Sequence, residues 1–257
     1  MDKPLSSLEQ HFHLPRIRQV NASRPFHWLH MGWSDMRANL GTSLAYGFIL
    51  AAIGYAILSY AATMPYLFTA AISGFLLIGP LAAAGLYEIS RRHERGEPVS
   101  LAGSLRGLWQ HADGMAYFGA FLAITLIGWE RMSAILFALF YGGNLPEVTN
   151  FFGDVFLSGD HLSFVLAYMV AGGVLAAVVF ALSAIAIPMM MDRDTDAITA
   201  AMTSLRAVAV NLGAMALWAA LIVVLVALGF ATMMIGMIVL LPLLGHATWH
   251  AYRDMVG

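Results

Sequence analysis

The sequence predicts an all-α, polytopic membrane protein with six transmembrane helices arranged as three hairpins. Of its 257 residues, 60% are hydrophobic and only 11% are charged, and the mean hydropathy is +0.75. This is too little charge to cover a soluble globule of that size. The apolar residues also form six runs of about 20 residues each, the length that an α-helix needs to cross roughly 30 Å of hydrocarbon.

Polar or turn-forming segments separate these runs and predict where the chain reverses. The predicted spans are residues 43–60, 66–89, 115–141, 161–191, 208–228 and 232–252, within a membrane domain of residues 43–253. They pair into hairpin units at about 43–90, 115–191 and 208–252. Residues 1–42 predict a polar tail with an interfacial helix, and their composition is unlike that of a cleavable signal sequence. The first span is therefore expected to be a retained anchor.

The positions of lysine and arginine predict the orientation, because the cytoplasmic flanks of transmembrane helices accumulate these residues. Every Lys and Arg except Arg131 falls on one side of the predicted spans: Lys3, Arg16, Arg18, Arg24, Arg37, Arg91, Arg92, Arg95, Arg106, Arg193, Arg206 and Arg253. The longest loop on the opposite side carries the carboxylates Glu147, Asp154 and Asp160. Both termini are therefore predicted to be cytoplasmic.

Charge and cysteine content exclude several classes of function. A formal net charge of -2 and a pI near 6.5 provide no basic surface for nucleic acid. The chain has no cysteine, which removes disulfides, thiolate metal sites and cysteine nucleophiles. It also has no nucleophile motif, no phosphate-binding loop and no dinucleotide fingerprint. Enzymatic activity stays open, but these absences favour a protein that is not an enzyme.

Short matches along the chain predict a threefold internal repeat. Ser104-Leu105-Arg106 precedes the third span and Ser204-Leu205-Arg206 precedes the fifth, while Asn39-Leu40-Gly41 before the first span matches Asn211-Leu212-Gly213. Each returning helix carries one proline, at Pro80, Pro188 and Pro242. The predicted unit is an amphipathic lead-in helix at the membrane surface, an outward span, and a returning span kinked at proline.

Alignment of the three units at their prolines predicts one polar cluster. Four residues after each proline come Ala84, Asp192 and His246, and eight residues after it come Glu88, Asp196 and His250. Positions four apart share one helix face. If the returning helices surround a pseudo-threefold axis, Glu88, Asp192, Asp196, His246 and His250 converge near the cytoplasmic end.

Imidazole and carboxylate groups in one place are compatible with three uses. His246 and His250 could present two nitrogens to a metal ion, or one of them could bind haem. The cluster could instead relay protons or ions, since histidine changes its charge near neutral pH. The third interpretation is interfacial, with these side chains hydrogen-bonded to lipid, loops and helix ends.

Glu130 and Arg131 form a second anomaly, because they lie within the apolar third span. An arginine at a helix centre costs about 2.5–3.5 kcal/mol on insertion scales, so a partner is expected. Neighbouring residues point about 100° apart on a helix, so these two cannot simply neutralise each other on one face. Arg131 is predicted to make an interhelical salt bridge, to reach the acidic outer loop, or to supply a counter-charge within a cavity.

Several longer segments resemble one protein family. They are Gly32-Trp33-Ser34-Asp35, Ser43-Leu44-Ala45-Tyr46-Gly47, residues 79–92 (GPLAAAGLYEISRR), Trp129-Glu130-Arg131 and residues 245–253 (GHATWHAYR). Together they resemble a proteobacterial family of predicted integral inner-membrane proteins of unknown function, some members of which are loosely likened to a respiratory oxidase subunit. The resemblance covers nearly the whole chain after about residue 25. It implies a bacterial inner membrane and six helices, and it supplies no catalytic residues.

These features favour a non-enzymatic accessory or assembly subunit of a larger membrane complex, such as a respiratory one. Its expected partners are the lipid bilayer and other membrane-protein subunits, but not nucleic acid. One alternative is a small transporter or ion-pathway protein that uses Glu88, Asp192, His246 and His250, with Arg131 as counter-charge. Another is a membrane oxidoreductase subunit that holds haem or a metal ion at His246 and His250.

Overall fold

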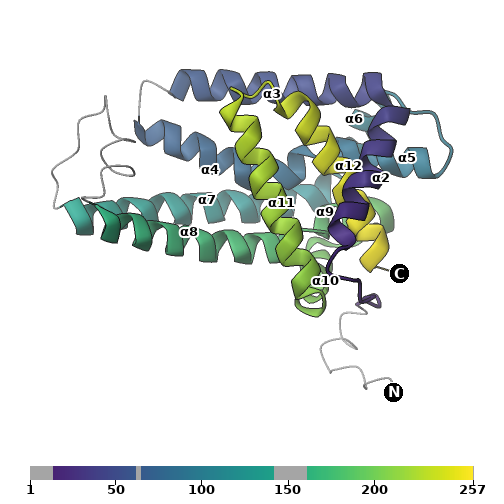
Figure 1. Ribbon diagram of the computed structural model, residues 1–257. Coiled ribbons are helices and arrows are strands. Elements are labelled where there is room, and N and C mark those ends of the chain that lie inside the picture. The colour runs from purple at the N-terminus through teal and green to yellow at the C-terminus, as the bar shows by residue number, and fades with distance from the viewer. Residues whose placement is uncertain (1–13, 62–64, 142–160, 257) are drawn as a thin grey trace, which may run out of the picture.

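The computed structural model describes residues 14–61, 65–141 and 161–256, which fold into helices (Figure 1). In chain order they are α2 (Arg24–Ala38), α3 (Leu40–Ala61), α4 (Pro65–Ala82), α5 (Ala84–Glu94), α6 (Leu101–Gln110), α7 (Ala112–Tyr141), α8 (Leu162–Ser183), α9 (Ala186–Arg193), α10 (Ala197–Val210), α11 (Leu212–Ala231) and α12 (Met237–Met255). The all-α class predicted from the composition is confirmed for these residues.

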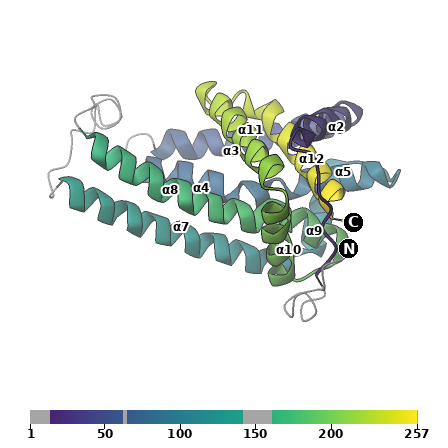
Figure 2. The same ribbon diagram turned by 60° about the horizontal axis from the view of Figure 1, so that its bottom comes forward.

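The long helices lie beside one another, and the short ones gather at one end. Helix α3 packs on α4, α4 on α7, and α7 on α8, while α11 runs obliquely to α7 and α8 in both views (Figures 1 and 2). We call the end formed by α2, α5, α6, α9, α10 and the second half of α12 the polar end. There Ile17 and Val256 form an isolated antiparallel β-bridge. The first and last described segments of the chain therefore meet at this end.

Five helical segments are long and apolar enough to cross a membrane: Leu40–Ala61, Ala70–Glu94, Ala112–Phe140, Leu162–Arg193 and Leu212–Ala231. The second joins α4 to α5, and the fourth joins α8 to α9. A multi-pass membrane protein is thus supported, but the predicted count of six spans is not confirmed. The sixth prediction, residues 232–252, falls largely on α12.

Helix α12 differs from the other long helices because its second half is polar and enclosed. Its first half is apolar, whereas His246, Trp249 and His250 follow in the second half. That half packs against α2, α3 and α5, and His246 is fully buried. A helix surrounded by protein does not need a continuous apolar surface, which explains why its average hydropathy is lower.

Three joints of one residue each link a short helix to the span that follows. Asn39 separates α2 from α3, His111 separates α6 from α7, and Asn211 separates α10 from α11. Their backbone angles are similar, with φ of -124°, -108° and -121°. At each joint the side-chain nitrogen donates to the carbonyl oxygen four residues earlier, at 3.2, 2.8 and 3.1 Å. The side chains thus satisfy backbone groups that the interrupted helix leaves open.

Each of these lead-in helices α2, α6 and α10 rests on a returning segment through a small residue. Ser104 donates to the carbonyl of Gly85 at 2.6 Å, and Ser204 accepts from the Ile185 nitrogen at 3.3 Å. The corresponding residue of α2 is Gly32, where a Cβ would lie 2.6 Å from the backbone nitrogen of Ala247. The repeat stays a prediction, which these three contacts support.

The same contacts give a register that differs from the alignment at the prolines. Pro80 precedes Gly85 and Pro242 precedes Ala247, but Pro188 follows Ile185. Proline lacks a backbone N–H, so Pro188 leaves the carbonyl of Ala184 without its helical donor, and the break between α8 and α9 falls there. The second unit therefore carries its proline further along the returning segment than the other two units do.

Candidate functional site

A buried histidine connects three helices at the polar end. His246 of α12 is fully buried between Ser43 of α3 and Ser90 of α5, which are also fully buried. Its Nε2 lies 3.0 Å from the Ser43 hydroxyl, and its Nδ1 lies 2.8 Å from the Ser90 hydroxyl. Both ring nitrogens are therefore engaged within the protein.

The direction of these hydrogen bonds follows from a fourth residue, Asp35 of α2. The Ser90 hydroxyl donates its proton to the Asp35 carboxylate at 2.6 Å. Because that proton is committed, the Ser90 oxygen accepts from Nδ1–H of His246. A neutral imidazole has one donor and one acceptor nitrogen, so Nε2 accepts from the Ser43 hydroxyl. The geometry thus fits a neutral His246, which avoids burying a charge.

Asp35 joins this chain of hydrogen bonds to the second histidine, His250. Nε2 of His250 lies 2.9 Å from the same carboxylate oxygen that Ser90 contacts. Burial by itself would raise the pKa of Asp35, but the hydrogen bonds from His250 and Ser90 outweigh it and lower the pKa below its usual value. We call Ser43, His246, Ser90, Asp35 and His250 the histidine network.

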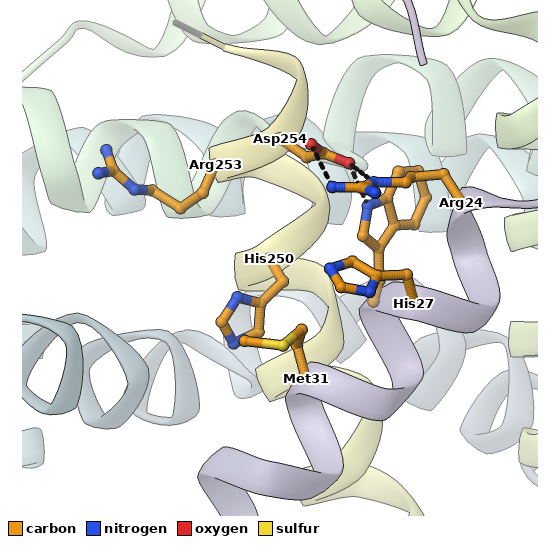
Figure 3. A pocket seen from close by; sticks show the side chains of 7 residues that line it. Arg24, His27, Met31, His250, Arg253 and Asp254 are labelled. Carbon is orange, nitrogen blue, oxygen red and sulfur yellow. Dashed lines mark hydrogen bonds and ion pairs between the residues drawn. The ribbon is translucent and has the colours of Figure 1, made fainter. Parts of the chain in front are cut away.

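His250 is the member of this network that reaches the surface. It is half-buried and lines a pocket of about 180 Å³ between α2 and α12. Figure 3 shows His27 and Met31 of α2 on the opposite wall, and Arg24 bonded to Asp254 at its edge. The Arg24 Nε to Asp254 Oδ2 distance is 2.6 Å. The histidine network therefore runs from this pocket to the beginning of α3.

Glu88 lies in the same region but belongs to a different set of contacts. Its side chain is fully buried and accepts from Arg91 Nε at 2.7 Å and from Arg92 Nε at 2.7 Å. Gly107 of α6 makes room for it, because a Cβ there would lie 2.6 Å from the Glu88 carboxyl carbon. Glu88 thus acts as a buried counter-charge for two arginines of its own helix.

Asp192 holds the ends of three helices together. It accepts from Arg95 at 3.1 Å, from the Tyr252 hydroxyl at 2.8 Å, and from Arg253 at 3.3 Å. Arg253 also donates to Glu94 at 2.9 Å. These contacts tie α9 to the ends of α5 and α12 through charged groups at the surface of the polar end.

Asp196 has a local structural role. It is the N-cap of α10, where its carboxylate accepts from the backbone nitrogens of Ile198 at 3.0 Å and Thr199 at 2.9 Å. The hydrogen bonds from Thr199, which outweigh desolvation, lower the pKa of Asp196. The shifted position of Pro188 in the second unit explains why Asp196 does not fall beside His250.

Glu130 and Arg131 lie in α7, away from the polar end. Arg131 is exposed on the surface of the helix, and Oε1 of Glu130 is buried without a hydrogen-bond partner. Neither side chain makes an ion pair within the described part of the chain. The acidic loop predicted as a contact for Arg131, with Glu147, Asp154 and Asp160, lies outside the described residues.

One known family matches the central helices of the chain. Residues 67–192 match the family described as predicted integral membrane protein (DUF2189). No curated protein and no solved structure matches the chain significantly. The resemblance to a family of integral membrane proteins of unknown function is thereby confirmed for this segment.

The DUF2189 segment runs from α4 through most of α9. It contains Ser90, Glu88 and Asp192, together with Glu130 and Arg131. The remaining members of the histidine network lie outside it, on α2, α3 and α12. The network is therefore assembled from the family segment and from helices on both sides of it.

Sequence reasoning missed three members of the network: Asp35, Ser43 and Ser90. Asp35 was the most accessible of these to prediction, because Trp28, Gly32, Asp35 and Met36 follow the spacing of one buried helix face. A carboxylate on such a face needs hydrogen-bond donors, and only the packing of α2 against α12 shows which ones. Ser43 and Ser90 carry no comparable signal, since isolated serines are common in transmembrane helices.

A metal site would require a different arrangement of the two histidines. Both nitrogens of His246 are bonded to serines, and Nε2 of His250 is bonded to Asp35. Among the described residues, no group of three or more His, Asp or Glu side chains is placed to hold a metal ion. The spacing of four residues brings the two histidines into one network, in which they take part in hydrogen bonds and are not arranged as metal ligands.

Proposed function

We propose that this protein is a non-enzymatic accessory or assembly subunit of a larger complex in a bacterial inner membrane, with both termini cytoplasmic. The observation that carries the proposal is Arg131, which is exposed in an apolar span and has no ion-pair or hydrogen-bond partner in the described part of the chain. On this proposal, Arg131 binds a carboxylate on a transmembrane helix of a partner subunit.

The depth of Arg131 supports this assignment. Helix α7 ends at Tyr141, ten residues later. At 1.5 Å per residue this is about 15 Å, close to half of the hydrocarbon thickness. An arginine side chain is too short to reach the headgroups easily from such a depth. An acidic partner would offset the cost of about 2.5–3.5 kcal/mol for placing an arginine at this depth.

The surface around Arg131 suits close contact with another helix. Gly128 and Ala134 are exposed beside it, and so are Ile127 and Ile135. Small residues let helix backbones approach closely in a membrane. Only 11% of the apolar window of α7 is buried, against 28–33% for the other candidate spans. Helix α7 is thus the least buried of the five candidate spans and the one most open to a partner.

The partner can be tested directly with a photo-crosslinking amino acid at Ile135 of the full-length chain in its native membrane. We expect crosslinks to an apolar segment of another polypeptide that contains Asp or Glu. Substitution Arg131→Leu should abolish co-purification of that polypeptide in mild detergent, and substitution of its carboxylate should do the same. The exposed neighbour Met132, changed by Met132→Leu, provides the control. Crosslinks to lipid alone would contradict the proposal.

A second function, a proton pathway, is favoured by the histidine network. Hydroxyl, imidazole and carboxylate groups follow one another at 2.6–3.0 Å from His250 to Ser43. Such groups can pass protons between them. This alternative predicts proton flux into proteoliposomes that Asp35→Asn and His246→Gln abolish. Equal flux with and without wild-type protein would eliminate it.

A further inference from the structure

The lead-in helices α2, α6 and α10 share an exposed apolar face. In each helix, the residue that follows the small contact residue is large, apolar and exposed: Trp33 after Gly32, Leu105 after Ser104, and Leu205 after Ser204. Their exposed fractions are 42%, 44% and 42%. All three helices thus present a large, apolar and exposed side chain directly after the small contact residue.

Further apolar side chains extend the same face. Phe26 of α2 and Ile198 of α10 lie two turns before Trp33 and Leu205, and they are 58% and 66% exposed. Trp109, one turn after Leu105 in α6, is 81% exposed. Residues at this spacing lie on the same side of a helix. Several large apolar side chains on one exposed face are unusual in contact with water alone.

The position of the three helices indicates what covers these faces. Each lead-in helix ends at a joint residue, and an apolar span begins directly after it, at Leu40, Ala112 and Leu212. The beginning of an apolar span marks the boundary between headgroups and hydrocarbon. In Figure 1, α2 lies across the end of α3 and does not continue its direction. The exposed faces are therefore continuous with the lipid-facing surface of the spans.

Cationic side chains flank two of these apolar faces. Arg37 is exposed in the last turn of α2, and Arg106 is exposed next to Leu105 in α6. Helices with an apolar face and flanking arginines bind membrane surfaces that contain anionic lipids. Trp33 and Trp109 suit the same layer, since tryptophan is enriched at membrane interfaces.

We propose that α2, α6 and α10 form a collar that inserts into the headgroup layer and binds the phosphate groups of anionic phospholipids through Arg37 and Arg106. This interaction does not depend on the partner subunit proposed for α7. It uses the other end of the molecule and a different chemistry. The collar would hold the joints at a fixed depth in the membrane.

The insertion can be tested with single-cysteine variants, because the natural chain contains no cysteine. Fluorophores at Trp33→Cys and Leu105→Cys should be quenched by nitroxide-labelled phospholipid in vesicles and protected from a water-soluble quencher. Labels at Ser34→Cys and Gln110→Cys, which are exposed but lie about 100° around their helices from Trp33 and Trp109, should show the opposite pattern. If all four labels respond alike, the collar does not insert. Protection from both quenchers at Trp33 and Leu105 would indicate a covering protein and would overturn the proposal.

Lipid selectivity tests the role of the arginines. We expect wild-type protein to prefer phosphatidylglycerol over phosphatidylcholine in lipid competition measurements. The variant Arg37→Gln/Arg106→Gln should lose about fivefold in this preference for each arginine removed. The matched control is Arg18→Gln, which removes an exposed charge before α2. An equal loss in the control would mean that net charge alone attracts the lipid, and the assignment to Arg37 and Arg106 would fail.

Discussion

The polar end and helix α7 differ in whether their charged side chains have partners within the protein. At the polar end, Glu88 and Asp192 each accept hydrogen bonds from at least two side chains. In α7, Arg131 is exposed in an apolar span, and Oε1 of Glu130 has no partner in the described structure. The same chain therefore pairs these two carboxylates in one region and leaves Arg131 and Glu130 without an ion pair among the described residues in the other.

This difference separates structural charges from charges available for recognition. A buried carboxylate with two arginines stabilises the fold only while the set is complete, because removal of one member leaves an uncompensated charge. An unpaired arginine in a span is costly to insert into the bilayer, and an acidic partner offsets that cost. Substitutions at the polar end should therefore change unfolding, whereas substitution of Arg131 should change assembly.

The largest effect is expected for Glu88→Gln. The substitution leaves Arg91 and Arg92 without their buried counter-charge, which should lower the free energy of unfolding by about 3–5 kcal/mol. Denaturant titration in mixed micelles measures this change. The control is Glu94→Gln, since Glu94 is 43% exposed, its bridge to Arg253 should contribute only about 0–1 kcal/mol, and the glutamine oxygen can still accept from Trp249. Similar losses in both variants would show that the polar end does not depend on buried pairing.

A smaller effect is expected for Asp35→Asn. Loss of charged hydrogen bonds from His250 and Ser90 should cost roughly 1.5–3 kcal/mol at neutral pH. The pKa of Asp35 is lowered in the folded state, so the ionised form favours folding above the pKa of an unfolded aspartate, about 3.9. This contribution disappears as the pH falls through the lower, folded pKa. The difference in unfolding free energy between wild type and variant should therefore shrink on acidification, and a constant difference would contradict the assignment.

Close packing of α2 on α12 predicts a similar or smaller effect for Gly32→Ala. The new methyl group would lie 2.6 Å from the backbone nitrogen of Ala247, which cannot move without shifting α12. We expect a loss of roughly 1–3 kcal/mol in unfolding free energy. Gly41→Ala is the control, because no atom lies within 4 Å of its added Cβ. That control should leave stability unchanged or raise it slightly through its helix propensity.

The smallest effect on the isolated chain is expected for Arg131→Leu. Because Arg131 makes no contact that holds the fold together, the unfolding free energy of the purified protein should change by only about 0.5 kcal/mol or less. The same denaturant titration provides the measurement. A loss as large as that of Glu88→Gln would show that Arg131 is a structural charge, and the contrast between the two regions would disappear.

The helical class and most of the spans could be predicted because they depend on local properties. Runs of apolar residues placed α3, α7, α11 and the combined segment of α8 and α9 to within a few residues. The last span was harder, because α12 combines an apolar first half with a polar half enclosed by other helices. Composition alone does not distinguish a polar helix in water from one covered by protein.

The candidate site was predicted only in part, for a geometric reason. The spacing of four residues places His246 and His250 on one face of α12, but their partners come from α2, α3 and α5. The prolines gave a register for the repeat, and Pro188 stands at a different place relative to its packing contact than Pro80 and Pro242 do. A short motif can be displaced in this way without visible change in the surrounding apolar sequence.

The sequence by itself determined that this is a multi-pass helical membrane protein, since hydropathy and charge density depend on composition and order along the chain. It also singled out Arg131, because a charge within an apolar run is visible without a structure. Only the tertiary structure decided that Glu88, Asp192 and Asp196 belong to separate sets of contacts and that Asp35 joins the two histidines. Hydrogen bonds form between atoms about 3 Å apart, and only the packing of helices brings residues from opposite ends of the chain to that distance.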